Sequence, residues 1–405
     1  MGSGRSLGER SRRLRAVIAE RVDREKAPGL VTGLARLDED GIEGVGVRAL
    51  DSTEPITSDT IFRVASLTKP IVAAATMSLV DEGKLELDGS IERHLPELAG
   101  RRVLKDIEGL LDETVPARRS ITVRDLLTCR MGFGIVHDPS DAHPIQKAAE
   151  ELQLCAFGPP HPRLPPPPDE WIRRFSTLPL MVQPGERWLY NSSFEVLAVL
   201  LARAAGQPLE RLLCERLFDP LDMKDTRFSV PAGKISRLSA CYGPAKAGGF
   251  ERVDPAEGGA WSQPPAFPSG AGGLVSTARD LLAFGRMMLA QGTHAKLRVL
   301  SAASVQAMTR DQLTPEQKVR SPMSADPAFW HHNGWGLGLA IATSAGARKP
   351  VGAFGWEGGF GTSWTCDPRD GTVAVLLTQW GASPAFGRLY DDFWDSLCGS
   401  PAPIS

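Results

Sequence analysis

Cysteine is scarce in this sequence, and so is tyrosine. Six cysteines are scattered over 405 residues without a Cys-x-x-Cys pair. Such spacing builds neither a disulfide framework nor a zinc site, and it suits a reducing compartment. We therefore expect a cytoplasmic protein without a structural metal.

Long apolar runs and an excess of one charge are absent as well. No run approaches the roughly 20 apolar residues that span a bilayer, and residues 1–22 read as a basic amphipathic helix rather than a signal peptide. The formal net charge is −2, whereas a nucleic-acid surface needs a basic face. We expect no membrane span, no nucleic-acid partner and no cofactor.

Short β-like segments lie at both ends of the chain, and helical patterns fill the middle. Thr372–Trp380 ("TVAVLLTQW") is a strand pattern bounded by turn residues. "STARDLLAFGRMMLAQG" predicts a helix with Ser276 or Thr277 as N-cap. The simplest assembly is an α/β (α+β) fold, in which residues 1–86 and 269–405 form one antiparallel sheet domain and residues 87–268 form an inserted, mainly helical domain.

Ser66 and Lys69 form the only Ser-x-x-Lys of the chain, at the start of an apolar helix. Residues three apart share a helix face, so the amine can reach the hydroxyl. A neutral lysine can act as general base on a serine, provided that an apolar setting lowers its pKa from about 10.4 toward 7. On its own, the motif is also common on solvated helices.

Two further motifs favour chemistry at Ser66. Tyr190 precedes a capped helix in "QPGERWLYNSSFEVLAVL", and a phenol beside a lysine can relay a proton, although it can also simply anchor the helix. Ser192 can donate to a substrate or cap that helix. In "FGWEGGFGTSW" a strand ends in glycines, whose backbone N–H groups can approach a ligand closely. Trp356 lies beside them and could equally be a core residue.

In this order, the motifs resemble those of the serine β-lactamase and penicillin-binding-protein superfamily. The branch with the strongest resemblance comprises class C β-lactamases and family VIII carboxylesterases. The similarity extends from about Pro28 to Trp394 and includes "SLTKP", "ITVRDLLT", "PGERWLYNSS", "SGAGGLVSTARDLL" and "FGWEGGFGTSW". It implies a β-lactamase/transpeptidase-like fold.

The resemblance also implies roles for the matching residues. Ser66 would be the acylated nucleophile and Lys69 its activating base. Tyr190 would shuttle the proton in acylation and deacylation. The backbone amides of Ser66 and Gly359 would form the oxyanion hole.

Three departures from the family pattern affect the expected substrate. Ser192 stands where lactamases usually carry Asn, and Cys129-Arg130-Met131-Gly132 replaces a frequent His-Thr-Ser-Gly. Trp356, followed by Glu357 and Gly358, occupies the place of Lys-Thr-Gly. Ser192, Trp356 and Gly358 are the substrate-binding residues that we expect.

The missing lysine favours neutral substrates. In lactamases and peptidases that lysine helps to hold the substrate's carboxylate, whereas an indole offers apolar surface and one N–H. The leading hypothesis is a serine carboxylesterase for small-molecule esters of short to medium acyl chains. A β-lactamase, an amide or peptide hydrolase and an acyltransferase stay open because they would use the same acyl-enzyme. A non-catalytic protein that binds peptides or cell-wall fragments is the alternative of another class.

Overall fold

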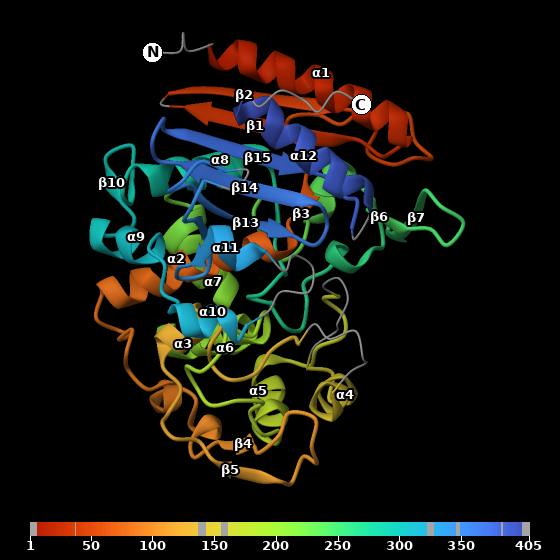
Figure 1. Cartoon of the computed structure of the whole chain (residues 1–405). Coiled ribbons are helices and arrows are strands. Elements are labelled where there is room, and N and C mark those ends of the chain that lie inside the picture. Colours follow the sequence, from red (N-terminus) through yellow and green to blue (C-terminus); the bar gives the residue numbers. More distant parts are fainter. Residues whose placement is uncertain are drawn as a thin grey trace.

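One antiparallel sheet joins the two ends of the chain (Figure 1). The computed structural model describes residues 6–36, 38–136, 143–154, 161–321, 328–345, 349–381 and 384–398. The seven strands follow one another across the sheet in the order β11 (Asn333–Trp335), β12 (Ala340–Ala342), β13 (Phe354–Gly358), β14 (Thr362–Asp367), β15 (Thr372–Leu377), β1 (Leu30–Arg36) and β2 (Glu39–Val45).

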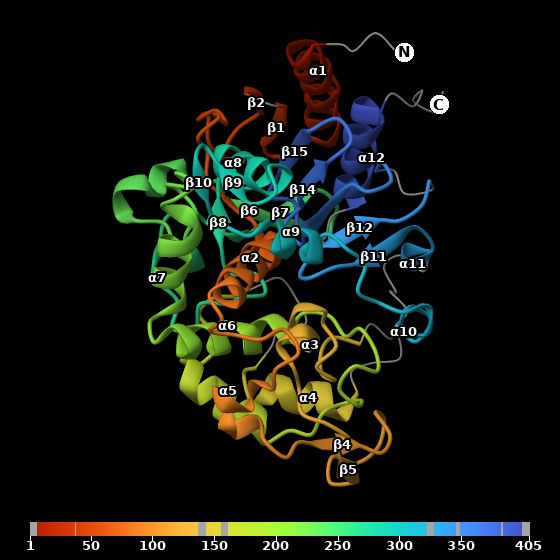
Figure 2. The ribbon, with the colours of Figure 1, turned by 90° about the vertical axis from the view of Figure 1, so that its left-hand side faces the viewer.

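Both faces of this sheet are covered by helices, as its strand patterns require. Side chains alternate between the faces of a strand, and β1 is apolar on both. Leu30 and Leu34 pack with α1 (Leu7–Glu25) and α12 (Pro384–Cys398). Val31 and Ala35 belong to the main core on the opposite face, which contains α2 (Thr68–Asp81) and α8 (Ala278–Leu289). Figures 1 and 2 show α1 and α12 together on one side of the sheet.

A mainly helical region lies on the far side of α2 from the sheet (Figure 2). Its elements are β4 (Arg102–Leu104), β5 (Thr114–Pro116), α3 (Val123–Leu127), α4 (Pro144–Glu151), α5 (Pro168–Ser176), α6 (Ser192–Ala205) and α7 (Leu209–Leu213). Smaller elements connect it to the sheet, namely β3 (Phe62–Arg63), β6 (Cys241–Pro244), β7 (Phe250–Asp254), β8 (Val275–Ser276), β9 (Thr293–His294), β10 (Leu297–Arg298), α9 (Ala302–Met308), α10 (Pro315–Val319) and α11 (Phe329–His332).

Helix α2 is buried between the sheet and the helical region. Every residue from Thr68 to Leu79 is buried, as expected for a helix that is apolar on all sides. Pro70 lies in its first turn, where the missing N–H needs no helical partner. The sequence therefore places Lys69 in the interior, in the first turn of the helix.

The predicted fold class is confirmed, since both ends of the chain supply strands to the sheet. The predicted helix after Thr277 is confirmed too: the Thr277 side chain accepts the N–H of Asp280. The domain boundaries at residues 87 and 268 stay a prediction. Among the described helices, none combines the length and the apolar character needed to cross a membrane.

Candidate active site

Ser66 lies in a short 3₁₀ turn, Ala65–Leu67, that leads directly into α2. The preceding Ala65 has a φ of 45°, a left-handed conformation that costs an L-residue about 1–2 kcal/mol. Such strain persists only where the surrounding structure enforces it, and it is frequent at functional sites. Ser66 is half-buried, whereas Lys69 is 0 % exposed. Ser66 is therefore partly accessible to solvent while Lys69 is enclosed.

Lys69 is surrounded by hydrogen-bond acceptors. Its Nζ atom lies 3.0 Å from Ser66 Oγ and donates to Asn191 Oδ1 at 2.9 Å and to the Ala271 carbonyl at 2.6 Å. A neutral amine has two hydrogens, and Asn191 and Ala271 accept both. Its lone pair is then left to face the Ser66 hydroxyl.

The electrostatic environment favours that neutral amine. Burial lowers the pKa of the Lys69 ammonium from 10.5 to about 7, against smaller opposing effects from Cys129 and Glu195. Burial also raises the pKa of the Cys129 thiol to about 12, so this neighbour is uncharged near neutral pH. Lys69 can therefore accept a proton in the neutral pH range.

Tyr190 contacts both Lys69 and Ser66. Its ring lies under Lys69, with 4.3 Å between Nζ and the ring centroid. Burial raises the pKa of the Tyr190 phenol, although hydrogen bonds with the Ser66 and Trp356 side chains partly oppose this rise. Tyr190 therefore stays a neutral phenol that can donate a proton. The structure brings Ser66, Lys69 and Tyr190 into one cluster.

Asn191, rather than Ser192, reaches Lys69. Asn191 has φ 82° and ψ −67°, and the Ser192 N–H donates to the Tyr190 carbonyl at 3.2 Å. This is a γ-turn, a rare and strained conformation. It aims the Asn191 amide at Lys69, whereas Ser192 is 4 % exposed in the first turn of α6. Asn191 is therefore the residue of this turn that contacts Lys69, and the part of Ser192 in substrate binding stays a prediction.

Trp356 faces the cluster from β13. Its Nε1–H donates to Tyr190 Oη at 2.6 Å, and its ring meets Trp335 edge to face, with 4.6 Å between centroids. Trp188 stacks on Tyr190, with 5.2 Å between centroids. Phe329 and Trp330 continue this row of rings, and both are half-buried. We call Trp188, Phe329, Trp330, Trp335 and Trp356 the aromatic wall.

The end of β13 approaches the turn that carries Ser66. A Cβ on Gly358 would lie 2.4 Å from the Val64 carbonyl oxygen and 3.3 Å from Ala65 Cβ. Only glycine fits there, because every other residue would force the strand away from the turn. Gly359 follows directly in the chain. Its part in an oxyanion hole stays a prediction.

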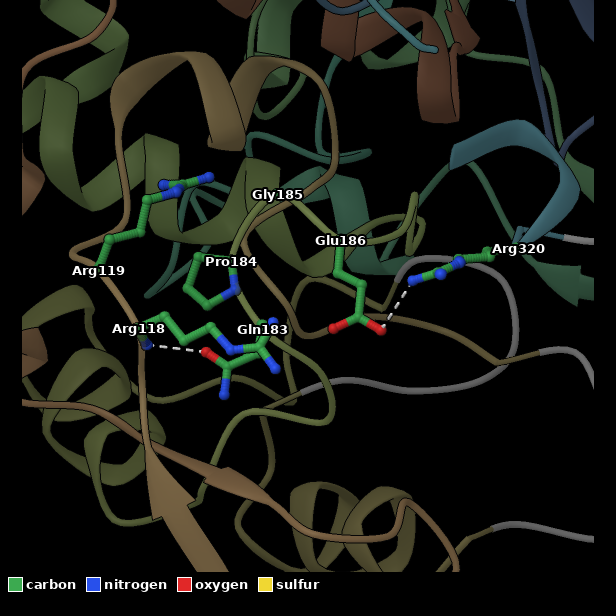
Figure 3. A pocket seen from close by; sticks show the side chains of 7 residues that line it. All are labelled: Arg118, Arg119, Gln183, Pro184, Gly185, Glu186 and Arg320. Atoms are coloured by element: carbon green, nitrogen blue, oxygen red, sulfur yellow. Dashed lines mark hydrogen bonds and ion pairs between the residues drawn. The ribbon is translucent and has the colours of Figure 1, made fainter. Parts of the chain in front are cut away.

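A separate cavity of about 710 Å³ lies on the loop before Tyr190, and Figure 3 shows its lining. The lining residues are Arg118, Arg119, Gln183, Pro184, Gly185, Glu186 and Arg320. Gln183–Glu186 is a turn with proline second and glycine third, and Gly185 has a φ of 85°. A Cβ on Gly185 would lie 2.3 Å from Arg119 Nη2. The cavity contains no residue of the Ser66 cluster, but its turn fixes the chain that leads into Tyr190.

Sequence reasoning missed the residues that orient Lys69. Asn191 directly follows Tyr190, and Ala271 lies in the quoted "SGAGGLVSTARDLL", so both were visible as parts of motifs. Their roles depend on a strained turn and on a backbone carbonyl, and neither has a pattern in the sequence. Trp335 is 0 % exposed and belongs to both the core and the aromatic wall.

Comparison with known proteins identifies the family of the chain. A model of the Beta-lactamase family matches residues 14–396. The chain belongs to the Beta-lactamase family. Within it, the chain is 39 % identical over 351 residues to Protein Rv1367c of Mycobacterium tuberculosis, covering 84 % of this chain and 82 % of that protein.

Two further comparisons concern a protein named as an esterase and a protein described as a hydrolase. Esterase EstB of Burkholderia gladioli is 29 % identical over 390 residues, covering 91 % of this chain and 90 % of EstB. The solved structure of EstCE1, described as a hydrolase with promiscuous acyltransferase activity, superposes with a TM-score of 0.77 at 22 % identity, covering 97 % of this chain and 100 % of EstCE1. At that identity the superposition shows the shared β-lactamase-like fold alone.

Proposed function

We propose that this chain is a serine carboxylesterase that cleaves neutral esters of short to medium acyl chains through an acyl-enzyme on Ser66. Three observations support the proposal: the contact between Lys69 and Ser66, the low pKa of Lys69, and the relationship to an esterase. A small-molecule ester is the expected partner, and a cytoplasmic location stays a prediction.

In acylation, neutral Lys69 takes the proton of Ser66 while Oγ attacks the ester carbonyl. The C=O becomes an oxyanion, which the backbone N–H groups of Ser66 and Gly359 would stabilise. Tyr190 gives its proton to the departing alkoxide as the ester C–O bond breaks, and the proton held by Lys69 restores the phenol. A water molecule then repeats these steps in reverse order and releases the acid.

The Trp356 indole is the observation that favours an ester over a lactam as the substrate. At the place of the family's lysine, an apolar ring lies against Tyr190 and uses its one N–H for the phenol. An anionic substrate would meet no cation from this position, whereas an uncharged ester loses nothing there.

The test compares an ester with a lactam. Purified protein should release p-nitrophenol from p-nitrophenyl butyrate with a kcat/KM at least a hundredfold above that for a chromogenic cephalosporin. Ser66→Ala should abolish both reactions, which excludes hydrolysis by another site. The reverse ranking would overturn the esterase and favour a β-lactamase.

The remaining alternatives give other readouts of the same experiment. Transfer is tested by adding an alcohol: if the new ester forms faster than acid is released, the protein is an acyltransferase, as the description of EstCE1 suggests for a member of this fold. Folded protein that neither turns over an ester nor takes a fluorophosphonate at Ser66 would favour a binding protein.

A further inference from the structure

Glu195 is a buried carboxylate without a role in the steps above. It lies in the first turn of α6, four residues after Asn191. Ser269 Oγ donates to its Oε1 at 2.6 Å, and the backbone N–H groups of Gly270 and Ala271 donate to the same carboxyl. Its second oxygen, Oε2, is buried and has no hydrogen-bond partner in the part of the chain that the structure describes.

The segment that Glu195 holds also holds Lys69. The Ala271 N–H donates to Glu195, and the Ala271 carbonyl accepts from Lys69 Nζ at 2.6 Å. The Gly272 N–H donates to Ser269 Oγ at 3.1 Å, which directs the Ser269 proton toward the carboxyl. Burial raises the pKa of the Glu195 carboxyl above its ordinary value, and the Ser269 hydroxyl, the charge of Lys69 and the backbone N–H groups of Ala271 and Gly270 oppose this rise.

The charge of Glu195 reaches Lys69 without a direct contact. Around Lys69 lie Ser66 from the nucleophile turn, Cys129 after α3, and Tyr190, Asn191 and Glu195 at the start of α6. The Cys129 thiol and the Tyr190 phenol are neutral near pH 7 because burial raises the pKa of each. Among the described residues, Glu195 is thus the carboxyl group whose ionised form raises the pKa of Lys69.

We propose that Glu195 is a positioning residue for Lys69. It fixes the Ser269–Ala271 segment so that the Ala271 carbonyl takes one Lys69 N–H, and its negative charge strengthens Lys69 as a base. The inference rests on the proposed function of Lys69 as the base of Ser66. The charge of Glu195 would then have two opposite effects on Lys69. It makes the neutral amine a stronger base, but it also raises the pH below which the amine is protonated and inactive.

The experiment measures how fast a fluorophosphonate labels Ser66 between pH 5.5 and 9. The variants are Glu195→Gln and Glu195→Ala, with Glu251→Gln as control because Glu251 is exposed on β7. In the wild type the rate should rise through pH 7 to a plateau. Glu195→Gln keeps an acceptor oxygen but loses the charge. The pH at which its labelling rate rises should therefore lie about one unit below that of the wild type, and its plateau rate should stay within threefold of the wild type. Ala loses the acceptor too, and its plateau should fall at least tenfold.

Two results would contradict the proposal. A Glu195→Gln profile that coincides with the wild type would remove the electrostatic role, and an unchanged Glu195→Ala plateau would remove the positioning role. If Glu195→Ala does not fold, the pH profile of Glu195→Gln decides. Labelling needs no ester turnover, so a wild type that is labelled with this profile but hydrolyses no ester would refute the esterase and leave this proposal standing. A wild type without labelling at Ser66 would refute both.

Discussion

At the scale of single residues, Trp356 has the most specific effect on the site. Its indole N–H donates to the Tyr190 hydroxyl, so the phenol directs its own proton toward Ser66. A lysine at this position would bring a second cation close to Lys69. The indole supplies one donor without that charge, which is compatible with a neutral lysine base.

Trp356→Phe should therefore reduce kcat/KM for p-nitrophenyl butyrate about tenfold. The variant removes one hydrogen bond, which is worth about 1–1.5 kcal/mol, and 1.36 kcal/mol corresponds to tenfold in rate. The control is Trp364→Phe, since Trp364 is paired with Trp356 across β13 and β14 but donates to the Leu281 carbonyl. We expect the control to lose thermal stability and to keep kcat/KM within twofold. Equal losses of activity in both variants would rule out a special role for the Trp356 N–H.

At the scale of elements, the alternation of β13 separates two functions. Trp356 faces Tyr190, and the next residue, Glu357, faces the opposite side of the sheet, where α12 lies. Lys349 Nζ donates to Glu357 Oε1 at 2.8 Å, and the Tyr390 hydroxyl donates to the same oxygen. Glu357, which stands at the Thr position of the family's Lys-Thr-Gly, thus anchors α12 in this chain.

Glu357→Gln should weaken that anchor. Burial disfavours the charge, but Lys349 and the Tyr390 hydroxyl lower the pKa of Glu357 overall. A lowered pKa stabilises the fold above the unfolded value of about 4.3, and this contribution is lost as the pH falls through the folded value. With 40 % of its side chain exposed, we expect a loss of about 1 kcal/mol at pH 7.

Urea unfolding at pH 7 and at pH 4 measures this loss. The difference between wild type and Glu357→Gln should shrink at pH 4, where part of the carboxylate is protonated. Glu20→Gln is the matched control because Glu20 pairs with Arg24 on the exposed side of α1, and it should change the free energy of unfolding by less than about half as much. A loss that is the same at both pH values would show that the charge of Glu357 does not stabilise the helix.

Elements with local signals could be predicted from the sequence, and contacts between distant segments could not. The Thr277 cap and the apolar spacing after it predict α8, and the run Thr372–Trp380 predicts β15. Lys349, Glu357 and Tyr390 lie in three segments whose encounter depends on the folded sheet. Asn191 was missed for another reason: its contact with Lys69 comes with a φ of 82°, a conformation that has no pattern in the sequence.

At the scale of the whole molecule, the buried Lys69 that the proposed reaction needs also lowers the stability of the fold near neutral pH. An ammonium group in this 0 % exposed position is unfavourable, so the folded protein holds the amine with a pKa of about 7 while the unfolded chain keeps about 10.5. Between these values the unfolded state binds one proton more than the folded state. The wild type therefore gains stability as the pH rises through this window.

Lys69→Met tests this opposition, because methionine fills similar space without a charge. The variant should be inactive and should lack the pH-dependent term, so its stability relative to the wild type should fall by about 2 kcal/mol between pH 7 and pH 9. The acceptors left by Lys69, Asn191 Oδ1 and the Ala271 carbonyl, lower the stability of the variant equally at both pH values, so they do not affect this difference. Urea unfolding at the two pH values measures it, with the exposed Lys296→Met as control. A constant offset between wild type and Lys69→Met would mean that Lys69 is still charged in the folded protein at pH 9, and a charged lysine cannot serve as the base of Ser66.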